Sequence, residues 1–241
     1  MENKFTHTEV MDDLKVVQAE EIVPVVIDLI NPSSVIDVGC GTASLLSAFK
    51  KRGIKITGLD GTWVNKKLLY ANIAQDEFVE RNLENSLADL KLKADLAICL
   101  EVAEHLSDKR ADSLVKDLTS MSDVVLFSAA IPRQGGQNHI NEQWPSYWEE
   151  KFKIQGYECH DILKDTIWDN EKILWWYRQN MVLYTKAGYQ FKKTDLKYNH
   201  IKKVVHPELF KTIVDYKEKN AVKRHTKILF KALLYKLGLV K

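Results

Sequence analysis

Two acidic residues stand where short apolar runs of the sequence end, and glycine follows both of them. Asp37 lies near the end of the run "SVIDV", and Asp60 ends the run "KITGLD". Because glycine has no side chain, the backbone after each acid can turn sharply and approach a bound molecule closely. An acid at a strand end can also accept hydrogen bonds from ribose hydroxyls. The residues expected to contact such a ligand are Asp37, Gly39, Cys40, Gly41, Asp60 and Gly61.

The ligand that suits these acids is either a dinucleotide or S-adenosylmethionine (SAM). A dinucleotide-binding turn has its third glycine at position 44, where this chain has Ser44. A pyrophosphate binds the N–H groups of a helix N-terminus and is disfavoured by a neighbouring carboxylate such as Asp37. SAM carries an ammonium and a sulfonium group, which an acid attracts. Asp60 fits the ribose of either ligand, so Asp37 is the residue that favours SAM.

Histidines and acids further along the chain are candidates for the chemical step. Methyl transfer from a sulfonium needs an acceptor oxygen or nitrogen about 3 Å from the methyl carbon and a group that removes its proton. Histidine suits that role because its pKa is near neutral. We predict His139 as the base, with Glu142 beside it, and His105 as the second candidate. If a helix begins at Glu101, His105 shares its face; the alternative is a histidine that only bonds to the backbone.

The polar segment "RQGGQNHINEQ", residues 133–143, concentrates hydrogen-bonding side chains in one predicted loop. Such a loop suits a hydroxyl-rich acceptor such as a sugar, although it could instead bond mainly to its own backbone. Arg178 could bind an anionic acceptor group or form a structural ion pair. No third residue stands at metal-ligand spacing from a histidine and a glutamate, so we predict no metal. The predicted substrate-binding residues are Asn141, Gln143 and Arg178.

Strand-like and helix-like segments alternate along most of the chain, which predicts a parallel sheet covered by helices on both faces. Pro24 falls inside the first helical segment, where it could kink or break the helix. The expected strands are 35–39, 54–60, 77–84, 94–102, 123–131 and 156–162, with a seventh inside 172–185 that includes Trp175, Trp176 and Tyr177. The expected helices are 12–30, 42–51, 63–72, 108–119, 144–155, 207–220 and 222–238.

Charge is unevenly distributed between the body and the tail of the chain. Residues 202–241 contain 11 basic and three acidic side chains, whereas the whole chain has a net charge of only +2. In the predicted helix 222–238, basic residues gather on one side and leucines with Phe230 on another. Such a helix could lie on an anionic membrane, pack on its own domain or bind a second subunit. The basic side lacks interleaved aromatic residues, so nucleic acid is not expected.

Three features of the sequence bear on the compartment. The three cysteines have neither a disulfide framework nor metal-ligand spacing, which favours reduced thiols. The first residues lack the apolar core of a signal peptide. No window reaches the roughly 18 apolar residues of a membrane-spanning helix. We therefore expect a cytoplasmic protein that could sit peripherally on the inner membrane face.

Four segments, in order, resemble the successive motifs of class I SAM-dependent methyltransferases: "VIDVGCGTA", "GLDG", "ERNLE" and "LAICLEVAEHL". The resemblance covers about residues 20–190. The segments "FSAAIPRQGGQNHINEQWPSYW" and "WWYRQN" resemble a bacterial subgroup often associated with glycan or secondary-metabolite biosynthesis. The resemblance implies a Rossmann-like, doubly wound α/β fold with a seven-stranded, mostly parallel sheet whose last strand is antiparallel.

The resemblance also implies the cofactor contacts. Asp60 would bind the ribose, and the adenine would lie near Asn82 and Leu83. Two positions depart from the family pattern: Ala43 replaces the usual third glycine, and Asn82 replaces an acid. Alanine is still small, and the side-chain oxygen of Asn82 can accept a hydrogen bond from the adenine amine. The full set of predicted cofactor-binding residues is Asp37, Gly39, Cys40, Gly41, Asp60, Gly61, Asn82, Leu83 and Glu101.

These observations lead to one prediction with stated alternatives. We predict a SAM-dependent methyltransferase domain over residues 1–190 and a basic helical extension over 191–241. The expected reaction is O-methylation of a hydroxylated acceptor, with sugars or glycan intermediates preferred. The alternatives are a small secondary metabolite as acceptor, a non-catalytic SAM-fold module, and a dehydrogenase, which Asp37 argues against. A homodimer is one candidate assembly.

Overall fold

A computed structural model describes residues 9–191, 205–214, 226, 229–230 and 234 of the chain. The chain divides into two units, residues 1–203 and 204–241. In the second unit the chain is helical over 207–214, which is the first part of the helix expected there. The predicted basic helix at 222–238 falls almost entirely outside the described residues. Within the described residues no helix has the length and apolar character needed to cross a membrane.

The first unit is built on one seven-stranded sheet with the order β3-β2-β1-β4-β5-β7-β6. Parallel pairing joins β3, β2, β1, β4 and β5, whereas β7 is antiparallel to both β5 and β6. The predicted fold class, with its antiparallel last strand, is confirmed. The strands are β1 (Ser34–Val38), β2 (Lys55–Asp60), β3 (Phe78–Glu80), β4 (Leu96–Leu100), β5 (Val124–Ser128), β6 (Tyr157–His160) and β7 (Val182–Lys186).

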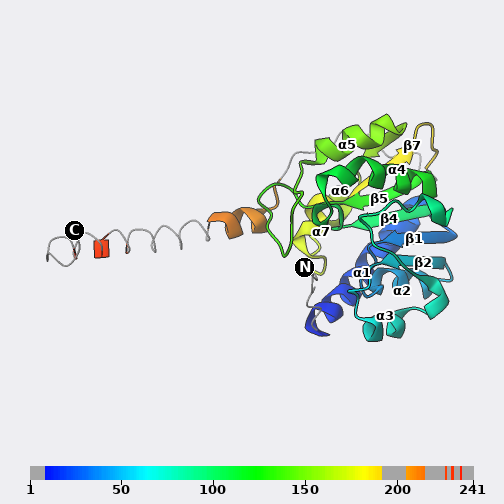
Figure 1. Ribbon diagram of the computed structural model, residues 1–241, viewed down its shortest axis with the longest axis horizontal. Helices are drawn as coiled ribbons and strands as arrows, with labels where there is room; N and C mark the ends of the chain where they lie inside the picture. Colours follow the sequence, from blue (N-terminus) through cyan, green and yellow to red (C-terminus); the bar gives the residue numbers. More distant parts are fainter. Residues whose placement is uncertain (1–8, 192–204, 215–225, 227–228, 231–233, 235–241) are drawn as a thin grey trace. The chain divides into compact units, whose positions relative to one another are not determined.

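Helices connect these strands and cover the sheet on both faces (Figure 1). The longest is α1, which continues through Pro24 without a break. The α-helices are α1 (Glu9–Ile30), α2 (Ser44–Lys50), α3 (Lys66–Asn72), α4 (Ala111–Met121), α5 (Pro145–Ile154), α6 (Lys164–Ile167) and α7 (Trp175–Asn180). Short 3-10 helices are Gln75–Glu77, Ala88–Leu90, Ala103–His105 and Asp108–Arg110.

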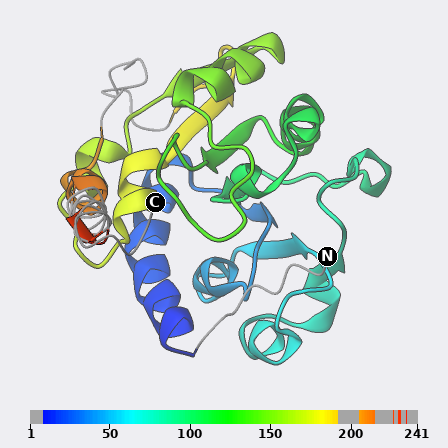
Figure 2. The ribbon, with the colours of Figure 1, turned by 60° about the vertical axis from the view of Figure 1, so that its left-hand side comes forward.

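Two separate hydrophobic cores explain why the strand sequences are apolar at nearly every position. Because successive side chains of a strand point to opposite faces, neighbouring residues of β1 and β4 enter different cores. Val35 and Leu96 belong to the core that contains α1 and α2, and Ile36 and Ala97 to the core that contains α4 and α5. The two groups of helices lie on opposite sides of the sheet in Figures 1 and 2. A doubly wound sheet follows directly.

One predicted element is wrong. Trp175, Trp176 and Tyr177 were expected in the seventh strand, but they form the helix α7, and the strand β7 begins only at Val182. The helix closes with a hydrogen bond from the Met181 backbone N–H to the carbonyl of Tyr177. Consecutive large aromatic residues carry no periodicity that separates a strand from a short helix. Tertiary packing decides: Tyr177 packs against the core that contains α1 and α2.

Candidate functional site

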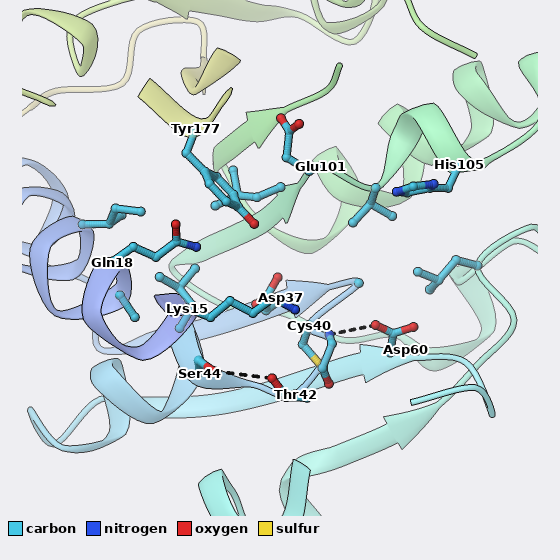
Figure 3. Close-up of a pocket in the computed structure, with 18 of the residues that line it drawn as sticks. Lys15, Gln18, Asp37, Cys40, Thr42, Ser44, Asp60, Glu101, His105 and Tyr177 are labelled. Atoms are coloured by element: carbon cyan, nitrogen blue, oxygen red, sulfur yellow. Dashed lines mark hydrogen bonds between the residues drawn. The ribbon is translucent and has the colours of Figure 1, made fainter. Parts of the chain in front are cut away.

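A cavity of about 290 Å³ lies beyond the carboxyl ends of β1, β2 and β4. The chain runs outward from β1 through β2 to β3, and then returns to β4 on the other side of β1. Open α/β sheets bind their ligands at such a reversal of strand order. Figure 3 shows Asp37 and Asp60 at the strand ends, with Gln18 from α1 and Tyr177 from α7 across from them. The cavity is therefore at the place where this fold binds ligands.

The turn after β1 needs the glycine at position 39. Its φ is +88°, and a side chain there would meet Val102 at 2.3 Å. The backbone N–H groups of Gly39 and Cys40 both donate to the carbonyl of Leu59, at 2.7 and 3.1 Å, which ties this turn to the end of β2. Ala43 also has a left-handed conformation, with φ of 61°. The family's usual third glycine would adopt that conformation without the cost that alanine bears.

Asp60 fastens two backbone turns at the cavity. Its Oδ2 accepts a hydrogen bond from the Gly41 N–H at 2.8 Å, and its Oδ1 accepts one from the Gly61 N–H at 2.7 Å. The side chain of Trp63 also hydrogen-bonds to this carboxylate. Because each carboxylate oxygen has two lone pairs, the group can still accept a hydrogen bond from a ribose hydroxyl. The ring of Trp63 lies where a side chain at position 61 would stand, at 2.2 Å, and it lines the cavity while 38% exposed. Trp63 is therefore a wall of the cavity and not a core residue.

Asp37 is the most unusual acid of the cavity. Only 4% of it is exposed. Burial, and then the charge of Asp60, raise the pKa of Asp37 to about 8. A cationic group placed beside it would favour the ionised form and lower that pKa. Cys40 lies next to it with a thiol whose pKa is raised by burial, so it is not a reactive thiolate.

Glu101 follows β4 and connects three parts of the chain. Its carboxylate accepts hydrogen bonds from Gln134 at 2.9 Å and from Asn180 at 3.1 Å. Asn180 also donates to Gln134 at 2.9 Å. Burial raises the pKa of Glu101, and these donors partly offset that effect. In Figure 3 the carboxylate points away from Asp37, which agrees with these contacts. One expectation from the sequence is a helix that begins at Glu101. Because Glu101 has a left-handed φ of 53°, no regular α-helix begins there.

The loop 131–143 is folded around Glu142. The carboxylate of Glu142 accepts hydrogen bonds from the backbone N–H groups of Arg133 at 2.7 Å and Gly135 at 2.8 Å. It also lies 3.0 Å from Nδ1 of His139. A side chain at Gly136 would meet the His139 ring at 2.2 Å. The loop is thus an ordered support that fixes the orientation of one histidine.

This loop brings His139 to a group that we call the histidine cluster: Glu104, His105 and His139. The rings of the two histidines are 4.8 Å apart, edge to face. The carbonyl of Glu104 accepts hydrogen bonds from the N–H groups of Ile140 at 2.9 Å and Asn141 at 3.0 Å, which holds the loop against it. Burial and the charge of His139 lower the pKa of His105 to about 4, which makes His105 a weak base at neutral pH.

The structure brings most, but not all, of the predicted residues together. Those that line the cavity are Asp37, Gly39, Cys40, Gly41, Asp60, Leu83, Glu101 and His105. Asn82 is exposed, and its side-chain oxygen accepts a hydrogen bond from the Glu84 N–H. Arg178 is buried and donates to the carbonyl of Trp168. Asn141 is buried, and its side-chain oxygen accepts a hydrogen bond from Gln143. None of these four lines the cavity.

Several residues of the site were missed from the sequence. Gln18 lines the cavity although it lies far from the glycine-containing segments. Gln134 and Asn180 hold Glu101. Glu104 lies in the segment "LAICLEVAEHL" but is not among the predicted site residues. The polar character of 133–143 and of "RQN" was the available signal, but only folding shows which side chains meet.

Comparison with known proteins defines the class. Residues 18–155 match the family model described as "Methyltransferase domain". The match covers more than half of the chain, so the chain belongs to this methyltransferase family. Together with the fold, this confirms the prediction of a class I SAM-dependent methyltransferase, a transferase enzyme. No curated protein sequence matches the chain.

Solved structures share the fold at low sequence identity. A SAM-dependent methyltransferase from Archaeoglobus fulgidus is 14% identical over 71% of this chain and 94% of its own, with a TM-score of 0.53. The magnesium protoporphyrin IX methyltransferase of Synechocystis PCC 6803, solved with bound SAH, is 17% identical over 76% and 90%, with a TM-score of 0.50. An O-methyltransferase family protein from Burkholderia thailandensis is 14% identical over 74% and 59%, with a TM-score of 0.53.

Proposed function

We propose that this enzyme transfers the methyl group of SAM to an oxygen of a hydroxylated acceptor, with sugars or glycan intermediates preferred. The observation that carries the cofactor assignment is the pair of buried acids at adjacent strand ends, Asp37 and Asp60. Asp37 would face the ammonium of SAM, Asp60 the ribose hydroxyls, and Trp63 would cover the adenine. The acceptor would then approach from the side of Glu101 and the histidine cluster.

The choice of oxygen as the methylated atom rests on the polar groups at that side. Loop 131–143 presents amides, carboxylates and imidazoles, which are the groups that hydroxyls bind. If a side chain removes the proton of the acceptor hydroxyl, His139 is the best-suited base. Glu142 lies beside it and can stabilise the protonated imidazole. A small secondary metabolite with hydroxyl groups fits the same chemistry, and it remains the second candidate for the acceptor.

The first experiment is transfer of radiolabelled methyl from SAM into a fractionated extract of the host. Nucleotide sugars, lipid-linked glycans, small metabolites and protein are separated before counting. Label in a sugar or glycan fraction supports the proposal, and alkali-stable label on oxygen distinguishes an ether from an ester. Label confined to protein or to nitrogen atoms contradicts it. SAM binding without transfer into any fraction favours a non-catalytic module.

A further inference from the structure

Three side chains that can bind metal ions meet at the edge of the cavity. Glu104 and His105 lie on the short 3-10 helix Ala103–His105, and His139 comes from the loop 131–143. One candidate ligand atom from each residue lies within 4.8 Å of the others. His105 also lines the cavity that contains Asp37 and Asp60. Any ion bound here would therefore lie beside the predicted place of the methyl group and the acceptor.

Glu104 is the observation that points to a cation. It is 0% exposed, and neither of its carboxylate oxygens has a well-aligned hydrogen bond within the part of the chain that the structure describes. Its neighbours are the backbone N–H groups of Glu104 and Ala130 and a second acid, Glu101, whose charge disfavours ionisation of Glu104. The buried Arg110 does not neutralise it, because Arg110 pairs with Asp117 at 2.6 Å. Buried carboxylates without a partner are costly, and in proteins they are usually paired or coordinate a metal. A cation bound beside this carboxylate would offset the cost of its burial and the repulsion from Glu101.

The two histidines are held in the way that metal-binding histidines usually are. Nδ1 of His139 lies 3.0 Å from Oε1 of Glu142, and Nδ1 of His105 lies 3.4 Å from the carbonyl oxygen of Asn138. A proton on Nδ1 in each contact leaves the lone pair on Nε2. Ligand histidines commonly donate their other N–H to a carboxylate or a backbone carbonyl, which fixes both tautomer and ring orientation.

We propose that Glu104, His105 and His139 bind one divalent metal ion such as Zn²⁺, and that the acceptor oxygen occupies an open coordination position. Two imidazoles and one carboxylate are ligands that Zn²⁺ accepts, and three protein ligands with an open position are typical of catalytic sites. Two ligands at about 2.1 Å from one ion lie at most about 4.2 Å apart. Small side-chain rotations therefore close the site around the ion.

The role of the ion rests on the proposed methyl transfer to oxygen. Coordination lowers the pKa of the acceptor hydroxyl, whose proton passes to solvent water. A lone pair of that oxygen then forms the new bond to the methyl carbon. The carbon–sulfur bond breaks, and its electron pair stays on sulfur, which turns from a sulfonium into a neutral thioether. In this reaction the histidines serve as ligands, and no side chain has to act as the base.

The test is a metal titration of the full chain after treatment with a chelator. Zn²⁺ is followed by calorimetry and Co²⁺ by its visible absorption, without SAM or acceptor. We expect one ion per chain. Glu104→Gln and His139→Asn each remove a ligand and should weaken Zn²⁺ binding by at least about 100-fold, whereas Glu142→Gln should weaken it about tenfold, as the loss of an outer hydrogen-bond partner does. Glu150→Gln, an exposed acid on α5, is the matched control and should change nothing.

SAM binding by each variant shows whether it is folded, and His139→Asn decides the matter if the buried Glu104→Gln variant does not fold. Equal Zn²⁺ affinity in the wild-type protein and in His139→Asn would overturn the proposal, as would a wild-type protein that binds neither ion. Metal binding with no methyl transfer into any extract fraction would instead contradict the proposed function. Transfer that persists in full after chelation would exclude the ion from the reaction.

Discussion

Around Asp37 and Asp60, the cavity is held by backbone hydrogen bonds between short segments of neighbouring strands, such as those from Gly39 and Cys40 to Leu59. Around Glu101 it is held by side chains that are far apart in the sequence, since Gln134 and Asn180 both donate to its carboxylate. The proposed cofactor side, around Asp37 and Asp60, thus depends on strand ends and turns, and the proposed acceptor side, around Glu101 and the histidine cluster, depends on a buried polar network.

This difference has a functional meaning. Turns at the ends of packed strands change little when loops change, so a common cofactor can be bound in the same way across many related enzymes. A network of side chains from loop 131–143 and α7 can be altered one residue at a time, which suits a surface that selects the acceptor. The comparison predicts that substitutions on the two sides affect different measurements.

The largest effect should come from Asp60→Ala. The variant loses the expected ribose contacts and the acceptor of the Gly41 and Gly61 N–H groups, and a hydrogen bond to a charged group contributes about 1.5–3 kcal/mol. We expect SAM affinity to fall by about 100-fold, measured by calorimetry. Glu80→Ala, an exposed acid in register with Asp60 on β3, is the control and should keep its affinity. Unchanged SAM affinity in Asp60→Ala would remove the ribose assignment.

Asp37 should couple SAM binding to pH. With a pKa of about 8, Asp37 is mostly protonated at pH 7 in the free protein, and the SAM cation favours its ionised form. Binding should therefore release a proton, and affinity should rise up to about tenfold per pH unit until pH 8 and then level off. Calorimetry in buffers of different ionisation enthalpy counts the proton. Asp37→Asn should show no such release; release by that variant would contradict the assignment.

Asn180→Ala should separate the two sides of the cavity. It removes the donor shared by Glu101 and Gln134, and the loss of about 1.4 kcal/mol corresponds to a tenfold change in rate. We expect methyl transfer to fall about tenfold while the SAM dissociation constant changes little. Asn170→Ala removes a similar amide–carboxylate hydrogen bond, to Glu21, and serves as the control. A loss of SAM affinity in Asn180→Ala as large as its loss of rate would break the comparison.

Ala43→Gly should have the smallest effect and the opposite sign. Ala43 has a φ of 61°, and relief of that left-handed conformation should stabilise the protein by about 1 kcal/mol, measured by urea unfolding. The same change at Ala48, inside α2, should destabilise it by about 0.5–1 kcal/mol. If both variants lose stability equally, the conformation at position 43 does not strain the turn.

The sequence by itself determined the cofactor side. Asp37, Gly39 and Gly41 lie within five positions, and Asp60 ends the next strand, so their local pattern also fixes their place at the sheet edge. Alternation of apolar segments was enough to give a doubly wound sheet, because each strand must bury both of its faces. The strand assigned to Trp175–Tyr177 failed because three adjacent aromatic residues carry no period.

Only the tertiary structure decided the acceptor side. Glu104 and His139 are 35 positions apart, and their meeting depends on hydrogen bonds from Ile140 and Asn141 to the Glu104 carbonyl. No spacing rule connects residues that approach through a loop, so the third ligand of the proposed metal site could not be found from the sequence. The residue type also does not reveal whether a glutamate is buried. From the sequence, Glu104 is expected to be a solvated acid, and only the packing around it in the folded protein excludes water.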